Sequence, residues 1–175
     1  MAFLVLGYPE ITENDFEWIQ EIRKTNDELY YNVVKPHFTI VFPIIKFTKE
    51  SFIQEIYNKI KIRPEAINFE LKCAVINRDD FINTWHVFLV PDKGFSDIVK
   101  IHDILYSDHL RDELRLDIDF IPHIGIANSK DVNKCKILTD DLNSGNFNIA
   151  GKLEELSIVN YENGKVDLLE KIKLK

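Results

Sequence analysis

Segments with strand patterns alternate with segments with helix patterns along all 175 residues, and short strand-to-strand turns interrupt the alternation. The clearest of these turns is Asn163–Gly164, the strongest short signal for a β-hairpin in the sequence. The hairpins favour an α+β fold with mixed or antiparallel sheets over a doubly wound parallel sheet. Because no linker rich in proline, glycine or serine divides the chain, we expect a single domain over residues 1–175.

Hydrophobic spacing and capping residues place the individual elements. The predicted helices run from Thr12 to about Leu29, from Thr48 to the stop at Arg63–Pro64, from Phe95 to His109, and from a cap at Ser129 to Leu142. The predicted strands are Ala2–Leu6, Pro36–Pro43, Ile67–Ile76, Thr84–Val90, Leu116–Ala127, Phe147–Val159 and Lys165–Leu169, with a hairpin loop at Asn77–Asp80. Residues 31–60 and 116–142 each give a strand, a short loop and a capped helix, which hints at an internal repeat.

Composition limits the possible functions. Hydrophobic residues make up 45% of the chain, which excludes a disordered protein. The formal net charge of -7 repels phosphate backbones at long range, so we expect no binding of long duplex nucleic acid and only short, local contacts. The sequence lacks both a signal peptide and an apolar run of membrane-spanning length, so we expect a soluble, cytoplasmic protein with no membrane contact. We also expect a monomer. Cys73 and Cys135 lack the spacing of a zinc site, and we expect both to pack in the interior.

Two similar pieces of sequence could carry chemistry: Pro36-His37-Phe38-Thr39-Ile40 and Pro122-His123-Ile124-Gly125-Ile126. Alternate side chains of a strand share a face. In the first piece Phe38, Ile40 and Phe42 are therefore predicted to point into the core, and His37, Thr39 and Val41 away from it. The same parity places His123, Gly125 and Ala127 on the face opposite Ile124 and Ile126.

Two imidazoles on either side of a phosphodiester could divide the proton transfers of its cleavage. A neutral ring takes a proton from water or a hydroxyl, and a protonated ring gives one to the departing oxygen. The Thr39 hydroxyl, two residues along the same face, could donate a hydrogen bond to a non-bridging phosphate oxygen. This chemistry needs no metal and no cofactor.

These paired motifs resemble those of the two-histidine (2H) phosphoesterase superfamily, which includes RNA 2',3'-cyclic phosphodiesterases and the 2'-5' RNA ligases. The resemblance implies a bilobal α+β fold with two pseudo-symmetric lobes and a central cleft. It implies a metal-independent hydrolase acting on a cyclic or 2'-5' phosphodiester of a nucleotide or RNA end. It also implies that His37 and His123 are the proton-transfer pair and that Thr39 is a phosphate-oxygen donor.

The second motif departs from the family pattern, which has threonine or serine where this chain has Gly125. The loss of a hydroxyl that bonds a charged oxygen costs about 1.5–3 kcal/mol, or roughly ten- to a hundredfold in rate. Three alternatives stay open: the glycine backbone approaches the phosphate closely, Asn128 or Ser129 supplies the donor, or the protein binds nucleotide or RNA ends without cleaving them.

The remaining candidates have weaker signals. Tyr8 could stack on a nucleobase and would then bind substrate. Lys35, next to the first motif, could make the local potential positive. Asp117 and Asp119 share strand parity with His123, which leaves metal-assisted hydrolysis through these residues as a lesser alternative. No third firm metal ligand stands at a recognisable spacing, so no metal site is predicted. The other three histidines fit packing or boundary positions: His86, His102 and His109.

Overall fold

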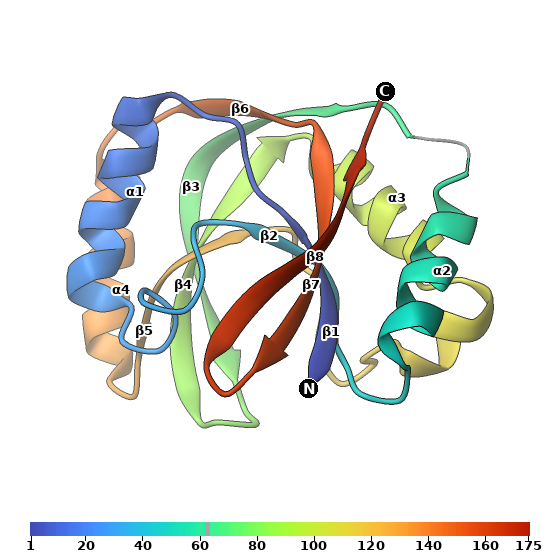
Figure 1. The fold of residues 1–175 in the computed structure, drawn as a ribbon. Coiled ribbons are helices and arrows are strands. Elements are labelled where there is room, and N and C mark those ends of the chain that lie inside the picture. Colours follow the sequence, from blue (N-terminus) through green and yellow to red (C-terminus); the bar gives the residue numbers. More distant parts are fainter. Residues whose placement is uncertain (62–63) are drawn as a thin grey trace.

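The computed structural model describes residues 1–61 and 64–175 and contains two four-stranded sheets at its centre (Figure 1). Every strand pairing within each sheet is antiparallel, which confirms the predicted α+β fold. Sheet A has the order β2 (Phe38–Ile44), β1 (Ala2–Gly7), β7 (Glu155–Glu162), β8 (Lys165–Lys173). Sheet B has the order β5 (Ile124–Ser129), β4 (Thr84–Lys93), β3 (Ile67–Asp79), β6 (Ile149–Leu153).

The helices lie on opposite sides of the sheets (Figure 1). On one side are α1 (Glu13–Asn26) and α4 (Val132–Ser144), which contact strands of sheet B. On the other are α2 (Lys49–Lys59) and α3 (Phe95–Leu105), and a 3₁₀ helix (Asp108–Glu113) follows α3. None of these helices is long and apolar enough to cross a bilayer.

One hydrophobic core joins the two sheets. Phe38 of β2 and Phe69 of β3 meet edge to face with ring centroids 5.2 Å apart, and both are almost fully buried. Such an aromatic pair contributes about 0.5–1.5 kcal/mol beyond the burial of its area. Phe38 directly follows His37 in the chain, so this contact between the sheets anchors the strand that carries the first motif.

Several predicted strand boundaries differ from the structure, and three of the differences change how the chain is arranged. The strand predicted from Leu116 begins only at Ile124. Turns precede it, and Pro122 has no N–H to donate to a neighbouring strand. The hairpin after β3 lies beyond Asp79, whose carboxylate accepts the N–H of Phe81 at 2.8 Å. The strand predicted at Phe147–Val159 is two strands, because β6 pairs with β3 of sheet B whereas β7 pairs with β1 of sheet A.

Two predicted helices have different ends. The third helix stops at Leu105, and Asp108 then adopts a φ of 45°, which an α-helix cannot contain. The fourth begins after Asp131, whose side chain accepts the N–H of Asn133 at 2.9 Å, so Asp131 replaces Ser129 as the cap.

The first two helices are shorter than predicted. The first ends at Asn26 instead of Leu29, because the chain turns away at Asp27. The second begins after the predicted cap Thr48, which forms a capping box with Ser51, and ends at Lys59. The predicted stop at Arg63 lies outside the described residues.

The two motif strands hold corresponding places, since β2 is an edge of sheet A and β5 an edge of sheet B. In β2 the predicted alternation holds for Phe38 and Ile40, which are fully buried. It fails afterwards, because Val41 is also fully buried and Phe42 only partly so. Irregularities in the β1–β2 pairing at this point explain the failure, since a bulge shifts the faces of the residues that follow.

Candidate active site

His37 and His123 occupy matching positions, each immediately before its edge strand, so the prediction that each histidine lies within a strand is wrong. The Nδ1 of His37 bonds the carbonyl oxygen of Lys35 at 2.7 Å, and the Nδ1 of His123 bonds that of Ile121 at 2.5 Å. A carbonyl only accepts, so each Nδ1 carries the proton. Both side chains are partly exposed, and neither Nε2 makes a hydrogen bond with the residues that the structure describes. Each Nε2 is therefore available to a substrate as a base.

Burial lowers the pKa of both rings to about 4, because desolvation disfavours the charged imidazolium. The pKa of His123 is lowered further by a positive charge on His37. The free pair is therefore neutral at pH 7, and double protonation is the least favoured state.

Aromatic neighbours hold both histidines. The His123 ring stacks on Phe88 of β4 with centroids 3.5 Å apart and an interplanar angle of 15°. The Tyr8 ring, directly after β1, lies 6.2 Å from the His37 ring; its substrate-binding role stays a prediction. Burial raises the pKa of Tyr8, so its hydroxyl stays protonated and can donate a hydrogen bond at neutral pH.

A family profile described as the 2'-5' RNA ligase superfamily matches residues 11–165, a span that contains both histidine motifs. The chain belongs to this superfamily. The resemblance seen in the paired motifs is thereby confirmed at the level of the family. Members of the 2'-5' RNA ligase superfamily are hydrolases or ligases acting on phosphodiester bonds.

Solved structures share the superfamily fold at low sequence identity. Escherichia coli LigT in its apo form is 14% identical over 99% of this chain and 96% of its own, with a TM-score of 0.57. LigT complexed with 3'-AMP is 12% identical over 99% and 97%, with a TM-score of 0.59. Kluyveromyces marxianus Usb1 is 10% identical over 96% and 97%, with a TM-score of 0.52. No match was found among curated proteins.

At Gly125, where the pattern of the 2'-5' RNA ligase superfamily has threonine or serine, the structure leaves room for a side chain. A Cβ built on Gly125 would meet no heavy atom within 4 Å, and the Gly125 backbone is not left-handed. Gly125 pairs with Phe88, so it shares a face with the ring on which His123 stacks. In the first motif, Thr39 is partly exposed, and its hydroxyl makes no hydrogen bond with the described residues.

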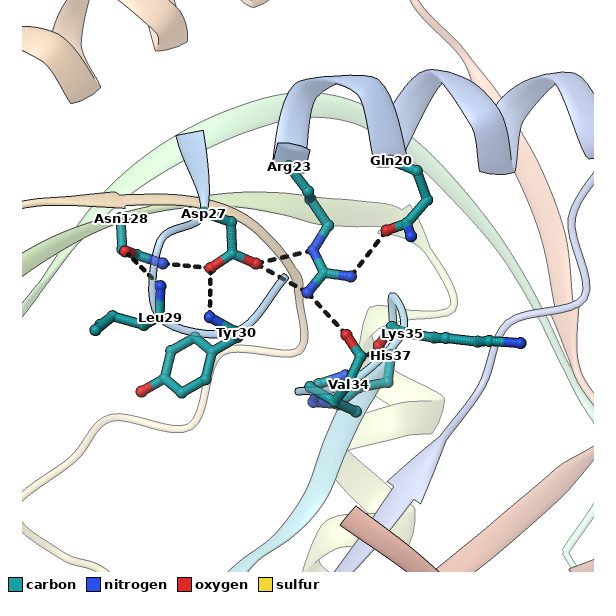
Figure 2. Close-up of polar contacts among 9 residues, drawn as sticks. All are labelled: Gln20, Arg23, Asp27, Leu29, Tyr30, Val34, Lys35, His37 and Asn128. Carbon is teal, nitrogen blue, oxygen red and sulfur yellow. Dashed lines mark hydrogen bonds and ion pairs between the residues drawn. The ribbon is translucent and has the colours of Figure 1, made fainter. Parts of the chain in front are cut away.

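A buried ion pair supports the segment that leads to His37 (Figure 2). Arg23 of α1 and Asp27 are 2% and 5% exposed, and the Arg23 Nε and Nη2 lie 2.9 and 2.8 Å from the carboxylate. The same guanidinium donates to the carbonyl oxygen of Val34 at 2.8 Å and to Gln20 at 2.9 Å. Arg23 therefore fixes the loop between α1 and β2 to the helix.

Asn128 of β5 extends this network to the second motif strand (Figure 2). Its Nδ2 donates to Asp27, and its Oδ1 accepts the backbone N–H of Leu29 at 3.3 Å. Asp27 also accepts the N–H of Tyr30 at 3.0 Å. Asn128 is 6% exposed and engaged at both ends of its amide, so it does not supply the donor missing at Gly125. It links the approach to His37 with the strand that follows His123.

The other predicted candidates have structural partners. His102 is buried, bonds the carbonyl oxygen of Ile40 at 2.8 Å and stacks on Phe120, and His86 is buried beside Phe88. Asp117 and Asp119 lie in a non-strand segment, so the predicted shared parity with His123 is wrong. Asp117 pairs with Arg115 at 2.6 Å.

Sequence patterns did not identify Phe88, Arg23 or Asp27 as parts of the site. A charged pair spaced i, i+4 on a helix is usually a solvated surface pair, and nothing local marks this one as buried. Phe88 fits any half-buried strand position. Only the pairing of β4 with β5 places it beneath His123.

Proposed function

We propose that the chain is a metal-independent phosphodiesterase that opens a 2',3'-cyclic phosphate, or cleaves a 2'-5' phosphodiester, at a nucleotide or RNA end. The observation that supports this proposal best is the matched pair of histidines. In each, Nδ1 bonds the carbonyl oxygen two residues earlier, and Nε2 makes no hydrogen bond to any residue that the structure describes. Two histidines held in the same way, each next to an edge strand of one of the two sheets, suit the opposite sides of one small anion.

For a cyclic phosphate, the chemistry divides between the two Nε2 atoms. One neutral ring accepts a proton from water as the water oxygen forms its bond to phosphorus. The other ring, protonated, donates to the ribose oxygen as the bond between that oxygen and phosphorus breaks. The products are a phosphomonoester and a free hydroxyl. The Thr39 hydroxyl donates to a non-bridging oxygen, on which negative charge builds up in the transition state.

Substrate binding leads to protonation of one of the two histidine rings, which then acts as the general acid. With a pKa of about 4, neither ring is protonated in the free protein at pH 7. A phosphodiester anion between the rings favours the imidazolium and raises the pKa of the pair. Because the two rings repel when both are charged, the bound pair takes up one proton, which leaves one acid and one base.

Complexes of relatives support a nucleotide substrate. Structures of LigT are described with 3'-AMP, with ATP and with NADP+. These ligands share a ribose phosphate, the group that the two histidines of this chain would flank.

The test is hydrolysis of nucleoside 2',3'-cyclic phosphates and of a 2'-5'-linked dinucleotide in the presence of EDTA. His37→Ala and His123→Ala should each remove nearly all activity. His109→Ala is the matched control, since His109 is exposed and lies outside both motifs. The optimum of kcat should lie at a higher pH than that of kcat/KM, because kcat reports the complex, in which the bound anion raises the pKa. Full activity in either motif variant would refute the proposal.

Gly125 favours a second candidate, a protein that binds nucleotide or RNA ends without turnover. The hydroxyl expected from the family pattern is absent there, and among the described residues Asn128 does not replace it. Binding of a 2',3'-cyclic phosphate with no product formed over a long incubation would support this candidate over the enzyme.

A further inference from the structure

A pocket of about 390 Å³ opens on sheet A beside the first histidine motif. Tyr8, Lys35 and Pro36 line the end nearest His37, and residues of β7 and β8 line the other end. The Tyr8 ring lies within 6.2 Å of the His37 ring, so the pocket and the proposed catalytic site are neighbours.

Strand register shows that the pocket continues the face on which the first motif lies. Thr39, Leu6, Ser157 and Lys171 are successive partners across β2, β1, β7 and β8. Directly paired residues project to the same side of a sheet. Three strand spacings separate the ends of this row, or about 14 Å. A phosphate bound at the histidines is too short to span that distance, whereas a nucleoside with a second phosphate has a length of that order.

Ser157 provides a second, independent indication of a ligand. It lines the pocket and is 1% exposed, and its Oγ has no hydrogen-bond partner among the residues that the structure describes. Native proteins rarely leave a buried hydroxyl unsatisfied, because desolvation without a partner is unfavourable. A polar ligand in the pocket would supply the missing partner.

The lining has the chemistry of a nucleotide site. Lys35 is exposed, and Lys171 forms an ion pair with Glu155. Two lysines and one glutamate leave a local positive charge in a chain of net charge -7. Val166 and Leu168, which lie on β8 with Lys171, offer an apolar surface to a base or sugar. Lysine binds phosphate as a point charge, and base faces pack on apolar side chains.

We infer that this pocket binds the nucleoside and second phosphate of an oligonucleotide end whose terminal phosphate lies between His37 and His123. This inference rests on the proposed function and specifies its substrate class as a single-stranded oligonucleotide of at least two residues. Lys171 binds the second phosphate, and Ser157, its direct partner across β7 and β8, donates a hydrogen bond to that phosphate. Lys35 adds positive charge at the end of the pocket nearest His37.

The test compares two product-like ligands that need no turnover, adenosine 3'-phosphate and the dinucleotide ApAp with a 3'-terminal phosphate, by isothermal titration calorimetry. We expect the dinucleotide to bind about tenfold more tightly. Lys171→Met should remove most of this advantage. Lys136→Met is the matched control, because Lys136 also forms an exposed ion pair, with Asp140, but lies on α4.

Ser157→Ala separates ligand binding from a structural role. We expect it to weaken binding of the dinucleotide and leave binding of the mononucleotide and the melting temperature without loss. The inference is overturned if both ligands bind equally, if neither binds, or if the advantage of the dinucleotide survives in both Lys171→Met and Ser157→Ala.

Turnover of the corresponding 2',3'-cyclic phosphates, measured separately, distinguishes the two proposals. A dinucleotide advantage that depends on Lys171 but comes without turnover supports the pocket and refutes the catalytic proposal. Turnover with equal binding of both ligands refutes the pocket alone.

Discussion

Replacing Gly125 with threonine should increase the rate of phosphodiester cleavage. The open space around a Cβ at this position and its ordinary backbone conformation allow a side chain without rearrangement. Gly125 lies in the interior of β5, where glycine is unfavourable by roughly 0.5–1 kcal/mol, so the variant should fold at least as stably. Any change in rate then reports on chemistry and not on folding.

The size of the effect follows from the hydrogen bond that the threonine hydroxyl would donate. Hydrogen bonds to charged groups contribute about 1.5–3 kcal/mol. At about 1.36 kcal/mol for each factor of ten, the gain in kcat/KM is roughly ten- to a hundredfold. If the natural chain only binds its ligand, the same substitution should produce measurable turnover.

The assay is hydrolysis of a nucleoside 2',3'-cyclic phosphate under conditions where the rate is proportional to kcat/KM. Gly125→Ala is the control, because it fills part of the same space and restricts the backbone in the same way without adding a hydroxyl. Gly125→Ser should resemble the threonine variant. If threonine and serine are no faster than alanine, the missing hydroxyl does not limit the reaction and the interpretation of this departure is wrong.

Three further predictions concern stability. The free energy of unfolding should fall as the pH drops from about 6.5 to about 4, because His37 and His123 take up protons in the unfolded chain but not in the folded one, where each has a pKa of about 4. Urea unfolding of the His123→Gln variant should show a weaker pH dependence. Asp27→Ala should cost about 3–5 kcal/mol in urea unfolding, because it leaves the buried Arg23 guanidinium uncompensated; a loss below 1 kcal/mol would contradict a buried pair. Gly164→Ala should lower stability by about 1–2 kcal/mol in thermal unfolding, since Gly164 has a φ of 74°, and an unchanged melting temperature would argue against this turn.

Local patterns predicted most of the elements because their causes are local. The cap at Thr48 and the turn at Asn163–Gly164 depend on neighbours only a few residues away, and both are present. Boundaries were less predictable where a distant contact decides them. The segment Phe147–Val159 has continuous strand character, yet its two parts belong to different sheets.

The candidate site divides in the same way. Strand parity predicted the buried Phe38 and Ile40, and repetition in the sequence singled out His37 and His123, whose catalytic roles stay predictions. Strand parity could not predict the bulge that buries Val41, because the irregular pairing arises between β1 and β2.

The sequence by itself determined the α+β class, the hairpin turn and the two histidine motifs, since these follow from periodicity, capping and turn chemistry among near neighbours. Only the tertiary structure decided what surrounds the histidines: the stacking of Phe88, the buried pair of Arg23 and Asp27, and the hydroxyl of Ser157, which has no hydrogen-bond partner in residues 1–61 and 64–175. The physical reason is that desolvation and strand pairing depend on residues far apart in the chain, and these act on one another only once the sheets have formed.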